Sequence, residues 1–216
     1  MKNSFSKTIN KLSNHYENLF KKYKYNVKSN QQSSIETQYR RFDQIVNRIN
    51  FKKNSSILDF GCGTGSLLNY LKIKKKFRGY YHGVDIAKSM VISNKKFYKG
   101  KNIKFSCQNI LKKRIKKKYD FVFVNGVFNN LTKDNWKLMK KILIELFKIT
   151  KQRLVFNNLS TYVDYKDKKL FYIPPEKVLS FCKKELSRYV VLDHGYKIKE
   201  NTIPYEFTTS VLKRKP

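Results

Sequence analysis

Cysteine, histidine and proline are scarce in this chain of 216 residues, which holds three, three and four of them. The cysteines Cys62, Cys107 and Cys182 cannot all pair with one another, and none of them has C-x-x-C spacing. Such a pattern is typical of reduced thiols in a cytosol and predicts no disulfide and no structural zinc. No group of His, Cys, Asp or Glu has the spacing of metal ligands, so we expect no metal site.

Long hydrophobic runs are also missing. The longest one covers residues 121–124, whereas a membrane-spanning helix needs about 18 apolar residues. Residues 1–7 lack the apolar block of about 7 to 15 residues that marks a secretory signal. We therefore expect a cytoplasmic protein with no membrane partner.

Acidic residues are few, because 15 Asp and Glu stand against 48 Lys and Arg, a formal net charge of +33. Hydrophobic residues still make up 40% of the chain, which excludes a disordered polycation. A strongly basic domain favours a nucleic-acid partner such as RNA. However, only eight of the 48 basic residues are Arg, which grips phosphate and guanine better than Lys does. The charge is therefore explained at least as well by codons rich in A and T.

The spacing of apolar residues divides the chain into two regions. Residues 1–50 form two amphipathic helical patterns separated by a polar stretch over 28–34, which predicts a helical cap. From residue 55 onwards, short β-rich runs alternate with helical patterns, which predicts a parallel sheet over 51–216. The last two runs are separated by about ten residues, too few for a parallel crossover, so they should pair antiparallel. The expected strands cover residues 56–60, 80–84, 103–107, 120–125, 154–158, 189–193 and 205–212.

The segment from Ile57 to Leu68 has the pattern of a buried strand, a glycine turn and a helix. Glycines at 61, 63 and 65 let the backbone turn tightly and leave no Cβ to keep a ligand away, and the following helix presents unpaired amides. Asp85 stands twenty residues further on, at the end of the second strand. A carboxylate there can accept hydrogen bonds from both ribose hydroxyls of an adenosine group, so the combination predicts a nucleotide site.

The glycines alternate as G-x-G-x-G and follow Asp59, unlike the G-x-G-x-x-G of dinucleotide enzymes. The run from Leu58 to Gly65 closely resembles the first motif of the class I S-adenosylmethionine (SAM)-dependent methyltransferases. The resemblance covers most of residues 55–213. It implies methyltransferase activity, SAM as cofactor, and an α/β fold: a seven-stranded Rossmann-like sheet, mostly parallel with an antiparallel last strand. Helices would cover both faces, and the N-terminal region would form a lid.

The resemblance also implies roles for particular residues. The glycine loop would wrap the methionine and ribose, with Asp59 near the methionine ammonium and Asp85 on the ribose hydroxyls. Ile86 and Met90 would pack against the adenine. Where the family commonly has an acid that touches the adenine amine, this chain has Asn109, which would serve through its amide oxygen. The implied cofactor site comprises Asp59, Gly61, Cys62, Gly63, Gly65, Asp85, Ile86, Met90, Asn109, Ile110, Asn125 and Gly126.

Asn125 and Gly126 follow the fourth expected strand, where the resemblance places groups beside the methyl donor. Asn-Gly is also a strong turn signal, so Asn125 could instead serve only to end the strand. Methyl transfer is an in-line displacement that needs alignment and, for some acceptors, removal of a proton. The candidates for these tasks are Asn125, Asn157, Tyr165 and His194.

The acceptor is less well defined than the donor. Asn125 is not followed by the Pro-Pro pair found in amino-methylating enzymes that act on adenine or glutamine, and no cysteine has the context of a cytosine nucleophile. Arg40 and Arg41 could contact a carboxylate of cofactor or acceptor, although solvated helix charges are the commoner explanation. We expect a small-molecule acceptor. An RNA methyltransferase and a non-catalytic SAM-binding protein are the alternatives.

Overall fold

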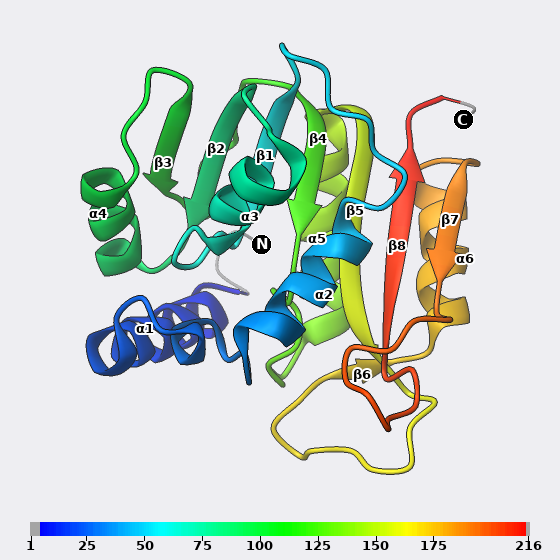
Figure 1. Cartoon of the computed structure of the whole chain (residues 1–216). Helices are drawn as coiled ribbons and strands as arrows, with labels where there is room; N and C mark the ends of the chain where they lie inside the picture. Colours follow the sequence, from blue (N-terminus) through cyan, green and yellow to red (C-terminus); the bar gives the residue numbers. More distant parts are fainter. Residues whose placement is uncertain (1–4, 215–216) are drawn as a thin grey trace.

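The computed structural model describes residues 5–214, so residues 1–4 and 215–216, at the outer ends of the two expected regions, lie outside the described part. One mixed sheet runs through the molecule in the order β3-β2-β1-β4-β5-β8-β7, and a short β6 pairs with β5 (Figure 1). The strands are β1 Ser56–Phe60, β2 Tyr80–Asp85, β3 Ile103–Cys107, β4 Tyr119–Val124, β5 Thr150–Ser160, β6 Tyr172–Ile173, β7 Val190–Asp193 and β8 Glu206–Leu212.

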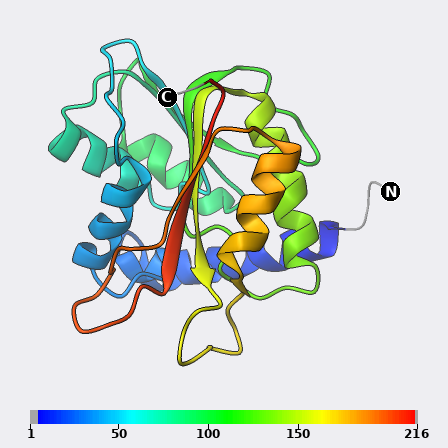
Figure 2. The same cartoon turned by 90° about the vertical axis from the view of Figure 1, so that its right-hand side faces the viewer.

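Helices cover both faces of this sheet (Figure 2). One face carries α2, α3 and α4, the other carries α5 and α6, and α1 crosses one edge of the sheet. The bounds are α1 Ser6–Tyr23, α2 Ile35–Ile45, α3 Ser66–Lys75, α4 Lys88–Phe97, α5 Asn135–Lys148 and α6 Pro175–Glu185, with a 3-10 helix η1 at Val27–Asn30.

The sheet has the expected pattern of directions. β1 to β5 pair parallel, whereas β8 runs antiparallel to both β5 and β7. The predicted mostly parallel sheet with an antiparallel last strand is therefore confirmed. The sheet differs from the expected seven strands by β6, which pairs with the end of β5. Two residues are too few to show a hydrophobic period, so the sequence pattern did not indicate this strand.

The central strands are buried on both faces, which explains their continuous apolar runs. On β1, Leu58 packs into the cluster that includes α5, while its neighbour Ile57 packs into the cluster that includes α2 and α3. On β4, Val122 and Phe123 divide between the same two clusters. Successive side chains thus stabilise opposite faces, and the sheet is a rigid support between two apolar layers.

The carboxyl ends of β1, β2, β4 and β5 meet at one edge of the sheet, where α1 and the segment before α2 also lie (Figure 1). Open parallel sheets bind ligands at this edge, at the point where the strand order reverses. That point lies between β1 and β4. The lysine-rich segment 72–76 ends α3 and lies at the opposite edge. The lysine-rich segment 112–118 begins near the cavity edge, where Lys113 N donates to the Asn109 carbonyl at 2.9 Å, and runs to the start of β4 at the opposite edge.

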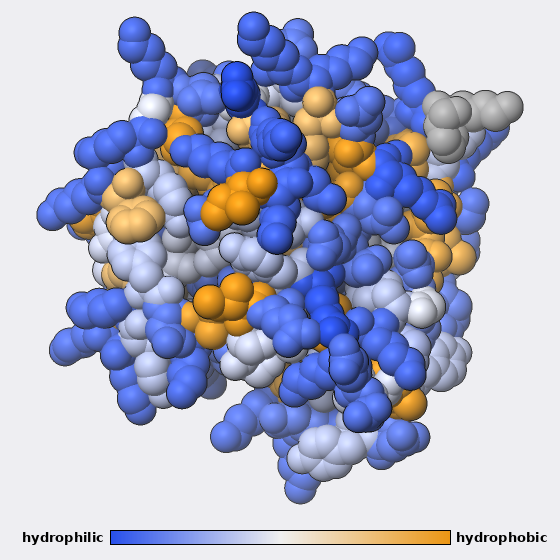
Figure 3. Space-filling view, in the orientation of Figure 1, coloured by the Kyte–Doolittle hydropathy of each residue, from blue (hydrophilic) through white to orange (hydrophobic). Residues whose placement is uncertain are grey.

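Hydrophilic side chains spread over the face seen in Figure 3 instead of gathering over one element. Apolar side chains appear there in small separate patches. Within residues 5–214, none of the helices combines the length and the hydrophobicity needed to cross a membrane.

Candidate functional site

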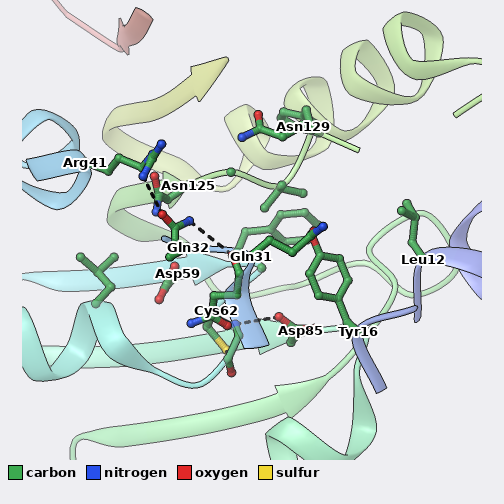
Figure 4. A pocket seen from close by; sticks show the side chains of 18 of the residues that line it. Leu12, Tyr16, Gln31, Gln32, Arg41, Asp59, Cys62, Asp85, Asn125 and Asn129 are labelled. Atoms are coloured by element: carbon green, nitrogen blue, oxygen red, sulfur yellow. Dashed lines mark hydrogen bonds between the residues drawn. The ribbon is translucent and has the colours of Figure 1, made fainter. Parts of the chain in front are cut away.

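A cavity of about 410 Å³ lies at the carboxyl edge of the sheet (Figure 4). One end is formed by the glycine loop and the ends of β1 and β2, and the other by α2, β8 and the loop after β5. The predicted residues that line it are Asp59, Gly61, Cys62, Gly63, Asp85, Ile86, Asn109, Ile110, Asn125 and Gly126.

The glycine loop exposes bare backbone to the cavity. Gly61, Gly63 and Gly65 have φ angles of +77°, +51° and +76°, a region that side-chain-bearing residues rarely adopt. A Cβ on Gly63 would lie 2.2 Å from Asn30 Oδ1. Gly65 is different, because it precedes α3 as its N-cap and its missing Cβ makes room for Tyr98 instead. The missing Cβ at Gly63 therefore lets the Asn30 side chain approach the loop closely, while Gly65 serves the packing behind it.

Asp85 lines the cavity from the end of β2. Its Oδ2 accepts a hydrogen bond from Gly63 N at 2.8 Å, and its Oδ1 accepts one from Ala87 N at 2.9 Å. Burial raises the pKa of Asp85, and the two backbone donors partly oppose this rise. Each carboxylate oxygen can accept a second hydrogen bond, so Asp85 can still bind hydroxyl groups of a ligand.

Asp59, at the end of β1, is the second carboxyl group of this end of the cavity. It is 2% exposed and accepts a hydrogen bond from the Tyr81 hydroxyl. Burial raises the pKa of Asp59 to about 7, and the Tyr81 hydroxyl offsets part of the rise. The protonated and ionised forms of Asp59 are therefore both populated near neutral pH, and an added cation would favour the ionised form.

The chain between α1 and α2 covers the cavity, and we call residues 26–34 the strap. Asn30 Nδ2 donates to Thr64 Oγ1 at 2.8 Å, and Thr64 N donates back to Asn30 Oδ1 at 3.3 Å. The strap also meets the loop after β4, because Asn130 Nδ2 donates to Gln31 Oε1 at 2.8 Å. The same Asn130 group donates to the Tyr16 hydroxyl of α1 at 2.9 Å. These bonds hold the N-terminal region against the glycine-loop end of the cavity.

The two arginines of α2 have different surroundings. Arg40 forms exposed ion pairs with Glu36 and Glu200, as expected of a solvated helix charge. Arg41 lines the cavity, its side chain is 12% exposed, and it pairs with the buried Glu206. The interpretation of Arg41 as a solvated charge is wrong, because its partner comes from a strand that is distant in sequence.

The predicted catalytic residues fall at different distances from the cavity. Asn125 lines it, and its Oδ1 is buried without a hydrogen-bond partner among residues 5–214. Asn157 does not line it, but its Oδ1 accepts from Gly126 N at 2.7 Å, directly behind the wall. Tyr165 is 79% exposed on the loop after β5, and His194 packs between Tyr162 and Phe207. Neither Tyr165 nor His194 lines the cavity.

Two predicted cofactor residues have other local roles. Met90 lies on the buried face of α4, in a cluster with Phe20 and Ala87, and does not line the cavity. The oxygen of Asn109, expected to meet an adenine, accepts from Leu111 N at 2.9 Å and so closes a local turn. One lone pair of this oxygen is left for a ligand.

Several lining residues were missed by the sequence analysis: Tyr16, Asn30, Gln32, Gln38, Asn129 and Glu206. They come from the lid, the loop after β4 and the last strand, and they belong to no motif. Tyr16 was assigned only to the apolar stripe of α1, although burial and the nearby Asp85 raise its pKa. The alternation of β8 could have drawn attention to Glu206, because an acid on a buried strand needs a partner.

Comparison with known proteins identifies the family. The sequence model of a methyltransferase domain family matches residues 51–178, and the chain belongs to this family. A protein of Mycobacterium tuberculosis named as a methyltransferase is 31% identical over 165 residues, covering 73% of this chain and 93% of that protein. A malonyl acyl-carrier-protein O-methyltransferase of Bacillus cereus is 35% identical over 79 residues, only 35% of this chain and 29% of that protein.

Solved structures share the fold at low sequence identity. Magnesium protoporphyrin IX methyltransferase from Synechocystis PCC 6803, with bound SAM, has a TM-score of 0.65 at 13% identity, covering 95% of this chain and 97% of that one. The plantazolicin methyltransferase BamL, in complex with a triazolic desmethylPZN analog and S-adenosylhomocysteine (SAH), has a TM-score of 0.59 at 16% identity, covering 98% of this chain and 100% of that one. The protein is a class I SAM-dependent methyltransferase.

The cavity fits this cofactor. SAM carries an ammonium group and ribose hydroxyls, and the cavity offers the carboxyl groups of Asp59 and Asp85. The missing side chain at Gly63 makes room for Asn30 of the strap, which covers the cavity at this point. The SAM expectation is thus confirmed by the family, and the geometry of the glycine loop agrees with it.

Proposed function

We propose that the protein transfers the methyl group of SAM to a small molecule with an apolar body. Asp85 would hold the ribose hydroxyls, Asp59 would face the methionine ammonium, and Ile86 and Ile110 would flank the adenine. Bound SAM supplies an electrophilic methyl group on a sulfonium. The residues of the chain orient the acceptor against that group and exclude water from it.

The observation that carries the proposal is the wall next to Asn125. Phe128, Leu159 and Leu170 line the cavity there, together with Tyr172. These residues follow β4 and end or follow β5, where acceptors lie in open parallel sheets. Such a wall suits an apolar molecule more than a charged one. The structural neighbours include enzymes named for porphyrin and plantazolicin substrates, which agrees with an acceptor of this kind.

RNA is a second candidate acceptor. It is favoured by the net charge of +33 and by a structural neighbour in a Pnkp1/Rnl/Hen1 RNA repair complex, with a TM-score of 0.62 at 13% identity. The lysine-rich segment 72–76 argues against it, because this segment lies at the edge of the sheet opposite the cavity, and the segment 112–118 leads away from the cavity to that same edge.

The decisive experiment follows radiolabelled methyl from SAM into a lysate of the source cell, separated into small-molecule, RNA and protein fractions. We expect label in the small-molecule fraction with the native enzyme and none with Gly63→Arg. Label in RNA or protein would contradict the proposed acceptor class. No label in any fraction, from enzyme shown to bind SAH, would contradict the proposal as a whole.

A pair of variants tests the apolar wall. Leu170→Trp should reduce labelling of the small-molecule fraction by about tenfold at unchanged SAH affinity, because overpacking a site costs about 1 to 3 kcal/mol. Leu131→Trp is the matched control, since the exposed Leu131 lies in the segment that pairs with residues 169 and 170 and does not line the cavity. Equal labelling by the two variants would place the acceptor elsewhere.

A further inference from the structure

We propose that Arg41 and Glu206 are positioning residues that fix, through Asn157, the turn after β4 beside the transferred methyl group. This inference rests on the proposed function, because it assigns that turn to the reacting end of the cavity. Its physical basis is a chain of hydrogen bonds that begins in the lid and ends at the Gly126 amide.

This hydrogen-bond chain links four segments of the fold. Gly126 N donates to Asn157 Oδ1 at 2.7 Å, and Asn157 Nδ2 donates to Glu206 Oε2 at 3.0 Å. Arg41 Nε then donates to both Glu206 oxygens, at 2.8 and 3.1 Å, and its Nη2 also donates to Oε1. Asn157 is 2% exposed and the Glu206 side chain 1%, so water cannot replace these bonds at low cost.

The hydrogen-bond chain has a direction, which the donor Gly126 N and the acceptor Glu206 set from its two ends. The two ends of an Asn amide have nearly the same shape, so packing alone does not decide which end faces Gly126. An ionised carboxylate only accepts hydrogen bonds, so it turns the Nδ2 of Asn157 toward itself. The Oδ1 of Asn157 is then left facing the Gly126 amide. The charge of Glu206 therefore specifies an acceptor for a backbone group that it does not touch.

Arg41 makes this buried charge tolerable and connects it to the lid. The Nη1 group of Arg41 donates to Gln32 Oε1 of the strap at 2.7 Å (Figure 4). Longer bonds reach the Thr37 carbonyl and the Tyr205 hydroxyl, both at 3.4 Å. All of the donor directions of Arg41 are thus used within the protein, so it is not free to bind a carboxylate of the acceptor. Its role is to neutralise Glu206 and to tie the strap to β8.

Gly126, the last member of the hydrogen-bond chain, lies at the cavity. Gly126 lines it with a φ of +71°, and the preceding Asn125 has a buried amide oxygen without a partner among residues 5–214. A hydrogen bond on the Gly126 amide fixes the plane of the peptide that follows Asn125. Shifts of about 1 Å at such a position can cost about 100-fold in rate, so a fixed turn matters for in-line transfer.

The first test uses Glu206→Gln and observes the Gly126 amide by NMR in protein labelled with ¹⁵N-glycine. The protein has eight glycines, so the spectrum is simple, and the signal that disappears in Gly126→Asn is that of the Gly126 amide. In Glu206→Gln, Arg41 retains the remaining oxygen, and the new amide nitrogen faces the Nδ2 of Asn157. We expect the Gly126 proton signal to move upfield and its hydrogen exchange to become about tenfold faster.

The second test restores the direction of the chain. In the double variant Asn157→Asp with Glu206→Gln, the carboxylate at position 157 accepts both from the side-chain amide introduced at position 206 and from Gly126. Shape and net charge match the native protein, so we expect the Gly126 signal and exchange rate to return to within about twofold of native. Arg41→Gln should disturb the signal, whereas Arg40→Gln, at an exposed ion pair one position away, should not.

An unchanged Gly126 signal in Glu206→Gln would overturn the proposal. So would a double variant whose signal is no closer to native than that of Glu206→Gln. If Glu206→Gln alone does not fold, the double variant still decides, because the proposal requires it to fold with a native signal. SAH titration of the native protein is the separate test of the proposed function: no binding would contradict that function, while the Gly126 result would stand by itself.

Discussion

The two ends of the cavity are built in different ways. At the glycine-loop end, which we propose binds the cofactor (the cofactor end), the two carboxyl groups of Asp59 and Asp85 form no ion pair within residues 5–214. At the other end, where we propose that the acceptor binds (the acceptor end), the carboxylate of Glu206 is neutralised by Arg41, 165 residues away in the sequence. The carboxyl groups of the cofactor end thus remain open to a ligand, whereas the charges at the acceptor end hold segments of the protein together. This difference teaches that a charged residue in a cavity wall is a ligand group only where its charge is not already paired.

The largest effect should come from filling the cofactor end. In Gly63→Arg, the new Cβ would lie 2.2 Å from Asn30 Oδ1 in a left-handed backbone conformation. We expect SAH affinity, measured by calorimetry, to fall by about 100-fold or more. Gly195→Arg is the control, because its Cβ would meet nothing nearer than 3.8 Å. Normal SAH binding by Gly63→Arg would mean that the cofactor does not approach this loop.

A smaller effect is expected from the bond between lid and glycine loop. Asn30→Ala removes the hydrogen bonds to the Thr64 hydroxyl and amide without filling space. SAH should dissociate about tenfold faster, since each bond is worth about 0.5 to 1.5 kcal/mol. Stopped-flow fluorescence measures the rate, and the exposed Asn54→Ala is the matched control. Equal dissociation rates would show that the strap does not retain the cofactor.

The buried acid Asp59 gives the cofactor end a pH dependence of stability. Its pKa of about 7 lies above the unfolded value of 3.8, because burial disfavours the ionised form. Between these values the folded protein binds the extra proton, so the contribution of Asp59 to stability falls as the pH rises. Asp59→Asn removes this loss of stability at high pH, because an asparagine side chain does not ionise. The melting temperature of Asp59→Asn should exceed that of the native protein at pH 8 and approach it near pH 5. A difference independent of pH would contradict this account.

The same contrast explains what could be predicted from the sequence. The loop from Asp59 to Gly65 and the acid Asp85 follow from local rules, because a strand, a glycine turn and the next strand place them side by side wherever they occur. Apart from β6, the strands and helices also follow from period and turn signals. Arg41 and Glu206 could not be joined in this way, since their contact exists only after α2 and β8 have packed at the same edge of the sheet.

Side-chain direction limited the remaining predictions. Met90 was expected at the adenine from the resemblance to class I methyltransferases, but α4 turns it toward Phe20 of α1. Which face of α4 the lid would cover is not encoded in the spacing of either helix. Tyr165 and His194 lie on or beside polar loops, and loop composition does not specify whether a side chain points toward a cavity or toward solvent.

The smallest effect should come from Asn158, next to Asn157 on β5. Asn158 is also 2% exposed, but within residues 5–214 its Oδ1 has no hydrogen-bond partner and its Nδ2 meets only the Met139 sulfur at 3.6 Å. Replacing a buried polar group that is poorly paired by an apolar one of similar size costs little, so Asn158→Leu should shift the melting temperature by no more than about 3 °C. Asn157→Leu should lower it by more, because it leaves the buried Gly126 amide without its acceptor and removes one of the two hydrogen bonds to Glu206 Oε2. Calorimetry of the two variants makes the comparison, and an equal loss in both would mean that the acceptor end is held by packing rather than by its hydrogen-bond chain.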